Sequence, residues 1–251
     1  MKVLTDTESL SAVAEAIRAK SGGDEPLVFP EGFVEAVEGI EGGNSYYDTF
    51  WDAFQDKGEA VVYTNAFYGS YWTDANFRPK YDIVPTTLSG AFQGAKITDI
   101  NKCLSDAGVV LDLSTGSVVA TGFGNMINGC PTISIPSPIN VSNTSNCGSM
   151  FRNAYKLQKA TIIGIKKTQG WNVCFQGCEE LTELYMQGSI GQNIDLSACG
   201  KLIGESVQSI IDALADLTEE TTQTLSLHAD VKAALSEQQL VSITQKNWTV
   251  A

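Results

Sequence analysis

The sequence predicts an α+β protein in which short N-terminal helices precede a β-solenoid of stacked repeats and a helical C-terminal cap. Three observations predict this arrangement: an acidic, helix-patterned beginning, a seven-residue frame that recurs along the second half, and a C-terminal segment with an apolar helical face. The 251 residues are 43% hydrophobic and 18% charged, a composition typical of a folded chain with a sizeable core.

Residues 1–43 are predicted to form two short helices that attach the chain to a partner or to copies of itself. Thr5 and Glu8 have capping-box spacing, and Pro30 suits the first position of the second helix. Two such helices have too little apolar surface to be stable alone. The apolar residues on their faces are the predicted oligomerisation residues: Leu10, Val13, Ile17, Phe33, Val37 and Ile40.

Residues 44–84 are predicted to form an aromatic-rich connecting domain, because 12 of the 22 aromatic residues lie between positions 46 and 81. Two interpretations remain open. The aromatic side chains form a compact core, or some of them form a platform that stacks on sugar rings or on a polymer of a host surface. Tyr68, Tyr71 and Trp72 are the candidate ligand-binding residues of such a platform.

Residues 85–203 carry a repeated frame: an apolar residue, a small residue three positions later, and another apolar residue three positions after that. The frame begins at Ile127, Phe151, Phe175 and Leu196, with an imperfect earlier copy at Phe92. Alternating apolar positions after it suit one short strand per repeat. Because each unit can bury its apolar edge only by stacking on the next, this period predicts a leucine-rich-repeat-like β-solenoid.

Residues 204–251 are predicted to form a capping module. Its apolar residues recur at helical spacing, as at Val207, Ile210 and Leu217. Residues 225–227 are predicted to form a strand, and residues 236–239 have the spacing of a capping box at the start of a helix. Trp248 is predicted to fold back onto the end of the repeats. A partly polar cover of this kind keeps the last repeat of a stack soluble.

The charge distribution limits the classes of partner. A net charge of −13 largely excludes a nucleic-acid backbone, no apolar run is long enough for a membrane span, and the opening residues predict no signal peptide. Residues 113–178 contain no acidic residue. Their basic residues are either ordinary solvated side chains or a patch for an anionic wall polymer. These candidate ligand-binding residues are Arg152, Lys156, Lys159, Lys166 and Lys167.

The residues that enzymes and metal sites require are scarce. His228 is the only histidine, which excludes a histidine triad and a two-histidine metal site, and the six cysteines contain no CxxC pair. One group of carboxylates has the spacing of a helix face: Asp48, Asp52, Asp56 and Glu59. A solvated helix face is the simpler interpretation of this group than the acid pair of a glycosidase. We therefore predict no catalytic residue, no metal and no cofactor.

Two stretches of the sequence resemble known families. The frame, as in Phe151-Arg-Asn-Ala-Tyr-Lys-Leu and Phe175-Gln-Gly-Cys-Glu-Glu-Leu, resembles the BspA-like leucine-rich repeats of bacterial surface proteins. The opening of the sequence resembles that of tail, baseplate and fibre proteins of phages of Firmicutes hosts. The resemblance lies in Ala14-Glu-Ala-Ile-Arg-Ala-Lys-Ser-Gly and in Leu27-Val-Phe-Pro-Glu-Gly-Phe. The closing stretch from Glu205-Ser-Val-Gln-Ser-Ile-Ile-Asp to Lys246-Asn-Trp-Thr resembles proteins of the same kind.

The resemblance implies a non-enzymatic virion structural protein, a tail-fibre or tail-tip component that contributes to host-surface recognition. It further implies attachment to other virion proteins through the N-terminal segment, a host glycan or wall polymer as ligand, and a homo-oligomer, commonly a trimer among phage fibres. The alternative is a bacterial cell-surface adhesin with the same repeat. A carbohydrate-active enzyme is a third hypothesis, for which no convincing carboxylate pair is found.

Overall fold

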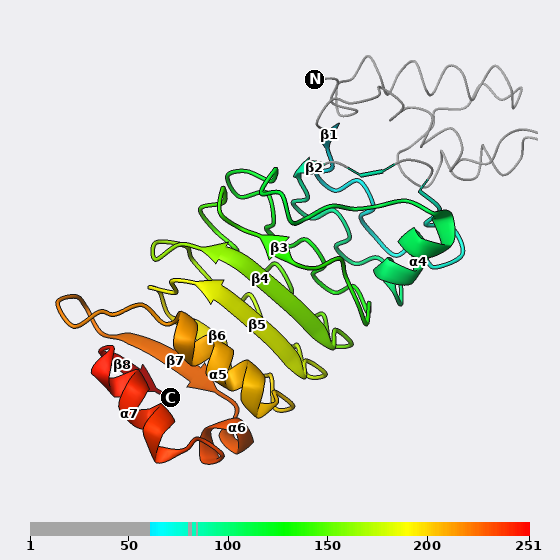
Figure 1. Cartoon of the computed structure of the whole chain (residues 1–251). Helices are drawn as coiled ribbons and strands as arrows, with labels where there is room; N and C mark the ends of the chain where they lie inside the picture. Colours follow the sequence, from blue (N-terminus) through cyan, green and yellow to red (C-terminus); the bar gives the residue numbers. More distant parts are fainter. Residues whose placement is uncertain (1–60, 80–81, 84) are drawn as a thin grey trace, which may run out of the picture.

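The computed structural model of this chain describes residues 61–79, 82–83 and 85–251. The predicted N-terminal helices lie outside the described residues, as do the acidic positions Asp48, Asp52, Asp56 and Glu59. The predicted oligomerisation residues lie outside them as well: Leu10, Val13, Ile17, Phe33, Val37 and Ile40. In the described part, successive chain segments lie side by side from β1 (Val61–Val62) and β2 (Pro85–Thr87) at one end to β7 (Gln223–Leu227) and β8 (Trp248–Val250) at the other (Figure 1).

The strands of the described residues are short and form three separate sheets in which every pair is parallel. The sheet orders are β1-β2, β3-β4-β5 and β6-β7-β8. The strands are β1 (Val61–Val62), β2 (Pro85–Thr87), β3 (Ile139–Asn140), β4 (Lys159–Ile165), β5 (Glu183–Gly188), β6 (Ile194–Leu196), β7 (Gln223–Leu227) and β8 (Trp248–Val250).

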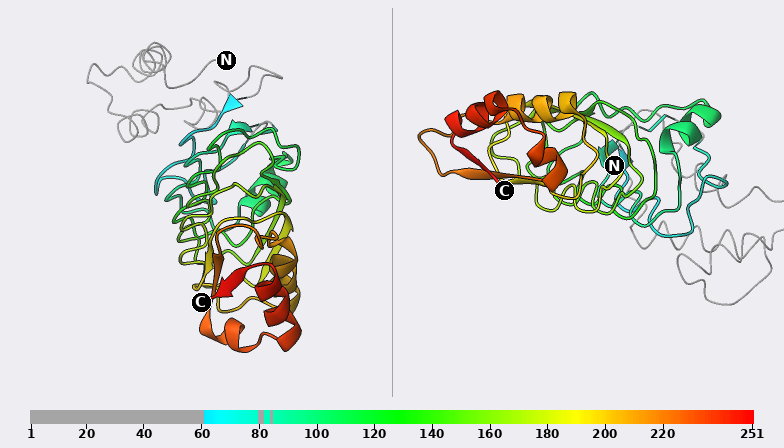
Figure 2. Two further views of the ribbon diagram at one scale, coloured as in Figure 1. Left: turned by 90° about the vertical axis from the view of Figure 1, so that its left-hand side faces the viewer. Right: turned by 90° about the horizontal axis from the view of Figure 1, so that it is seen from below.

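Four helices accompany these sheets in the described residues: α4 (Ile100–Ala107), α5 (Gly204–Ala213), α6 (Ala229–Ala233) and α7 (Glu237–Gln245). Side chains cap the beginnings of three of them, α4, α6 and α7. Asp99 caps α4 by accepting from the Lys102 backbone N–H, and the predicted capping box of Ser236 and Gln239 at α7 is confirmed. Helix α5 packs on β5, and α5 and α7 lie next to each other along one side of the C-terminal part (Figure 2).

The predicted leucine-rich-repeat-like β-solenoid with a helical cap is wrong. The described chain is an α+β structure with small parallel sheets, and its strands do not continue from one sheet into the next. The reason lies in the unequal spacing of the frames. The frames at Phe92 and Ile127 begin 35 positions apart, with α4 between them, and β3 has only two residues. The C-terminal segment is mixed rather than helical, because β7 and β8 complete the third sheet.

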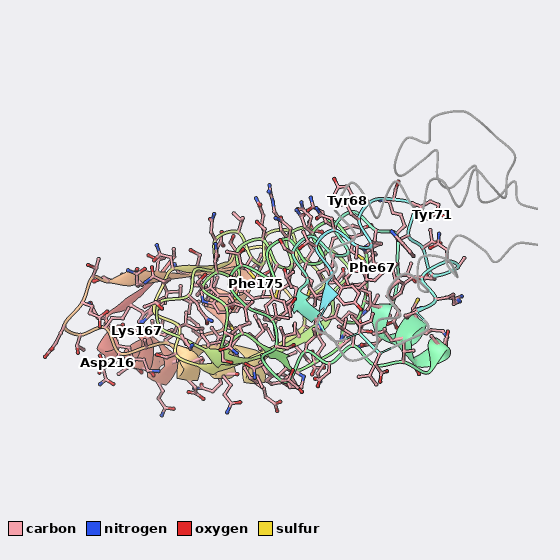
Figure 3. All side chains as sticks on the ribbon, turned by 90° about the horizontal axis from the view of Figure 1, so that it is seen from above. Phe67, Tyr68, Tyr71, Lys167, Phe175 and Asp216 are labelled. Carbon is pink, nitrogen blue, oxygen red and sulfur yellow. The ribbon has the colours of Figure 1, made fainter. Side chains whose placement is uncertain are left out.

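The repeated frame nevertheless marks one kind of turn. The first residues of four frames, Phe92, Ile127, Phe151 and Phe175, are each at most 1% exposed. The Phe151 and Phe175 ring centroids are 5.6 Å apart, and the Phe151 N–H donates to the Cys174 carbonyl at 3.1 Å. The first residues of successive frames therefore lie next to one another in a buried row, and we call this row the buried line of frame residues. Phe175 lies in the interior of the molecule (Figure 3).

The small positions of the frames are buried as predicted. Five of these side chains are inaccessible to solvent: Ala95, Cys130, Ala154, Cys178 and Cys199. Burial raises the pKa of Cys130 and Cys178 to about 12 each, so both thiols are protonated at neutral pH. These cysteines are free, and they pack as small apolar side chains where the chain turns inward.

The C-terminal segment closes this end of the described chain. The predicted strand at 225–227 is confirmed within β7, and Trp248 of β8 is 2% exposed, with its indole Nε1 donating to the Ala215 carbonyl at 2.9 Å. The predicted helical face is shorter than expected, because α5 ends at Ala213 and Leu214 has extended backbone angles.

Candidate functional site

The three aromatic candidates have different surroundings. Trp72 is 4% exposed and lies edge-on to the Phe67 ring at 5.3 Å between centroids, so it belongs to the core. Tyr71 is half-buried, edge-on to Trp72 at 5.8 Å. Tyr68 is 54% exposed, and of the three it is the one whose ring presents a large surface to solvent (Figure 3).

The predicted basic patch is partly neutralised by acidic residues from later segments. Lys159 Nζ lies 2.7 Å from Glu183 Oε2, because these residues are register partners in the parallel pair of β4 and β5. Lys167 forms an ion pair with Glu220, 53 positions later, and donates to the Asp216 carbonyl at 3.1 Å. These two lysines therefore do not present unpaired charges to an anionic polymer.

The other two lysines remain at the surface without such pairing. Lys156 and Lys166 are exposed, and neither forms an ion pair with another residue in the described ranges. Lys156 Nζ lies 6.0 Å from the Tyr155 ring centroid. Exposed lysines of this kind are mobile point charges rather than a preorganised site.

A second arrangement unites one aromatic candidate with one basic candidate. We call it the turn column: Tyr68, Gln93, Asn128, Arg152 and Gln176. The backbone N–H of the residue after each of the first four members donates to the carbonyl of the next member, which sets the five side by side. These bonds are Gly69 to Gln93 (2.8 Å), Gly94 to Asn128 (2.8 Å), Gly129 to Arg152 (2.9 Å) and Asn153 to Gln176 (2.6 Å).

The backbone of each turn explains which residue types follow the column members. The residues after the members have positive φ angles: 91° at Gly69, 72° at Gly94, 70° at Gly129, 56° at Asn153 and 75° at Gly177. Glycine and asparagine adopt this left-handed conformation at the least cost. The turn buries the frame's first apolar residue and leaves the next residue, the column member, partly or fully exposed.

The chemistry of the turn column is polar, with one cation and one exposed aromatic ring. Arg152 forms no ion pair with another described residue, and its buried Nε has no partner among them. Asn128 accepts from Asn153 Nδ2 at 3.5 Å and donates to Asn125 Oδ1 at 3.0 Å. Since neighbouring parallel segments lie about 4.8 Å apart, the column extends over about 19 Å.

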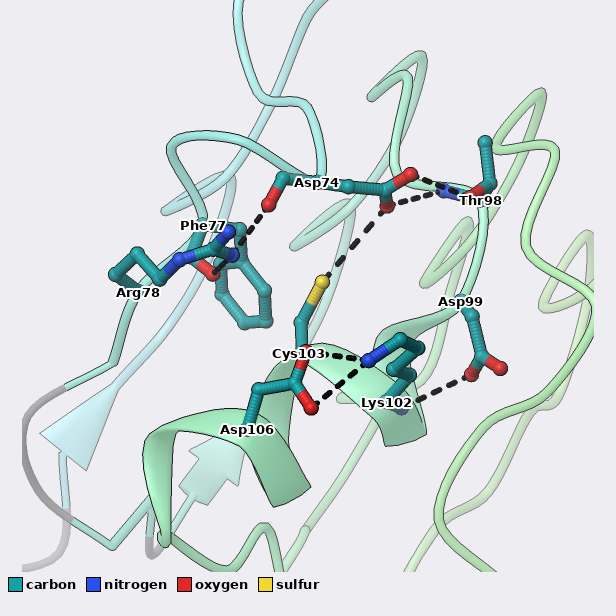
Figure 4. Close-up of polar contacts among 8 residues, drawn as sticks. All are labelled: Asp74, Phe77, Arg78, Thr98, Asp99, Lys102, Cys103 and Asp106. Carbon is teal, nitrogen blue, oxygen red and sulfur yellow. Dashed lines mark hydrogen bonds and ion pairs between the residues drawn. The ribbon is translucent and has the colours of Figure 1, made fainter.

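A cluster of acidic residues around α4 is engaged in structural contacts (Figure 4). Asp74 accepts from the Thr98 backbone N–H at 2.7 Å, and Asp106 pairs with Lys102 at 2.7 Å. Burial raises the pKa of the nearby Cys103 thiol to about 11, which keeps it protonated. Within the described ranges, no group of three or more His, Cys, Asp or Glu side chains is placed to hold a metal ion.

Sequence reasoning missed Gln93, Asn128 and Gln176 as members of one surface. The signal was present, because each of them directly follows the first apolar residue of a frame, as Arg152 follows Phe151. Superposing the frames on one another would have aligned these positions into a single row.

Comparison with protein-family models, with curated proteins and with solved structures gives no match to the chain. Among the helices of the described residues, none has the length and apolar character that crossing a membrane requires.

Proposed function

We propose that the chain is a non-enzymatic structural protein of a phage virion, a tail-fibre or tail-tip component that binds a polymer on the host surface. The turn column is the observation that carries this proposal, and the phage-like ends of the sequence support it. In this proposal residues 1–43 attach the chain to other virion proteins or to further copies, and no catalytic step is assigned.

The turn column suits an extended polymer better than a small molecule. Its members form a row about 19 Å long on an exposed surface, so a ligand contacts them one after another. Tyr68 offers a ring face for stacking, the amides of Gln93, Asn128 and Gln176 offer hydrogen bonds, and Arg152 offers a cation without a carboxylate partner in the described residues. Wall polymers combine sugar rings with hydroxyl and anionic groups. These groups are complementary to the ring, the amides and the cation of the turn column.

Arg152→Gln is expected to weaken binding of the purified full chain to isolated cell walls about tenfold, because a charge-assisted hydrogen bond contributes on the order of 1.5–3 kcal/mol. Co-sedimentation with walls from a panel of Firmicutes strains measures the affinity. The control is Lys166→Gln, which removes one positive charge outside the column and is expected to leave the affinity within about twofold. Equal loss in both variants, or no loss for Arg152→Gln, contradicts the role of the column.

The bacterial adhesin alternative shares this surface but differs in location. Mass spectrometry of purified particles and of washed cell envelopes separates the two, since a tail component is recovered with particles. Recovery with envelopes of uninfected cells alone would contradict the virion assignment and favour the adhesin.

A further inference from the structure

A polar groove is bordered in part by residues 170–173, which shortly precede Gln176, the last member of the turn column. It has a volume of about 400 Å³ and is bordered by the turn at Gly170–Val173 on one side and by β6 and β7 on the other. Its polar lining comes from three chain segments and consists of Asn172, Gln192, Asn193, Asp195, Thr224 and Ser226. None of these residues belongs to the turn column or to the predicted basic patch.

Strand alternation explains the polar wall of the groove. Asp195 and Ser226 are register partners in the parallel pair of β6 and β7, and they face outward, whereas the adjacent partners Ile194 and Leu225 are buried. Side chains two residues apart on a strand share a face, so Thr224 joins Ser226 on the outer side. The β pairing thus fixes a carboxylate beside hydroxyl groups.

The opposite wall is the segment Gly170–Val173, which precedes the last column member, Gln176, in the chain. Ser149 N–H donates to the Asn172 carbonyl at 2.9 Å, which joins this turn to the preceding one, but no backbone hydrogen bond among the described residues joins residues 170–177 to β6. Val173 in this turn has φ 45°, a rare conformation for a β-branched residue. The groove therefore opens where the regular bonding between turns stops.

Two lining side chains are held in place by the backbone. Asn193 Oδ1 accepts from the Thr224 N–H at 2.7 Å, and Asp195 Oδ1 accepts from the Ser197 N–H at 2.9 Å. These bonds leave the Asn193 amide N–H₂ and the second Asp195 oxygen for a ligand. Asn172 and Gln192 are exposed and add further amide groups. The groove thus offers preorganised donors and acceptors together.

The lining also has an apolar part. Its partly exposed apolar residue is Val173. Two others belong to the core: Trp171 is 2% exposed and stacks on Phe175 with an interplanar angle of 12°, and Ile194 is buried. An apolar wall beside amide, hydroxyl and carboxylate groups matches a molecule that has both C–H faces and hydroxyl groups. Among the described residues that line it there is one carboxylate and no Lys, Arg or His, which disfavours an anionic ligand.

We propose that this groove binds an uncharged sugar unit of the host-surface polymer. The inference rests on the proposed function and adds the class of ligand: a neutral carbohydrate whose hydroxyl groups donate to Asp195 and accept from Asn193. In this proposal the turn column contacts the extended chain of the polymer, and the groove binds one of its sugar units.

Titration calorimetry of the full chain with uncharged oligosaccharides of glucose, galactose, rhamnose and N-acetylglucosamine tests the proposal. Poly(glycerol phosphate), an anionic polymer, is titrated in parallel. Asp195→Asn is expected to weaken binding of the oligosaccharide that binds best by at least tenfold. The control is Asp216→Asn, since Asp216 accepts from the Thr218 N–H at 3.0 Å in the same local arrangement but lies outside the groove lining. It is expected to bind as the unchanged chain does.

Binding of none of the oligosaccharides at millimolar concentration overturns the inference, as does unchanged binding by Asp195→Asn. Urea denaturation of both variants confirms that they are folded. A failure of the proposed function is recognised separately, because Arg152→Gln tests the column on whole cell walls. Loss of sugar binding in Asp195→Asn, with normal wall binding by Arg152→Gln, supports the groove and contradicts the column.

Discussion

Replacing Phe175 with alanine is expected to lower the free energy of unfolding by about 3–5 kcal/mol. Phe175 is fully buried, its ring centroid lies 5.6 Å from that of Phe151, and the Trp171 ring stacks on it at 6.3 Å. Removing the ring leaves a cavity between two close-packed turns, and the rigid backbone bonds on both sides limit how far the site can collapse.

Urea denaturation followed by tryptophan fluorescence measures this loss. Gln176→Ala is the matched control, because Gln176 is the next residue, is exposed, and is expected to change stability by less than about 0.5 kcal/mol. A loss below about 1 kcal/mol for Phe175→Ala would show that the buried line of frame residues does not stabilise the fold.

Alkaline pH is expected to destabilise the protein steeply. Burial raises the pKa of Cys147 to about 11 and that of Cys130 and Cys178 to about 12, whereas an unfolded thiol titrates near 9. Below pH 9 both states bind the proton and the contribution of each thiol to stability is complete. Between pH 9 and the folded pKa only the native state keeps the proton, so stability falls by about 1.4 kcal/mol per pH unit and thiol.

Denaturation at pH 8 and at pH 10.5 measures this effect, which amounts to about 2 kcal/mol per thiol over that interval. Cys130→Ala is the control: it removes one titrating group and is expected to reduce the pH-dependent loss by that amount, whatever its stability at pH 8. Equal stability of the unchanged chain at both pH values would show that the thiols reach solvent in the native state.

Part of the fold could be predicted from the sequence, because local spacing carries the information. The small buried positions Cys130, Ala154 and Cys178 follow from the frame, and the cap of α7 follows from Ser236 and Gln239. The division into three sheets could not be predicted, since it depends on which segments of unequal length keep backbone bonds in register. Helix α4 was missed as well, although Asp99 and Gly108 are its natural caps.

The site was predictable only in part, for a related reason. The basic patch was defined by the absence of nearby acidic residues in the sequence, but Glu183 lies 24 positions after Lys159 and directly beside it in the parallel pair. Charges on neighbouring strands cannot be judged from a local window of sequence. The groove also escaped prediction, because Asn172, Asp195 and Ser226 come from three segments and meet only in the folded chain.

Hydrogen exchange with and without bound wall polymer tests the role of the turn column most directly. The amides of Gly69, Gly94, Gly129 and Asn153 follow the column members and report on that surface, whereas those of β4 report on a separate sheet. We expect saturating polymer to slow exchange in the column turns and to leave β4 unchanged. Slower exchange in β4 alone, or no change anywhere at saturation, would contradict binding along the column.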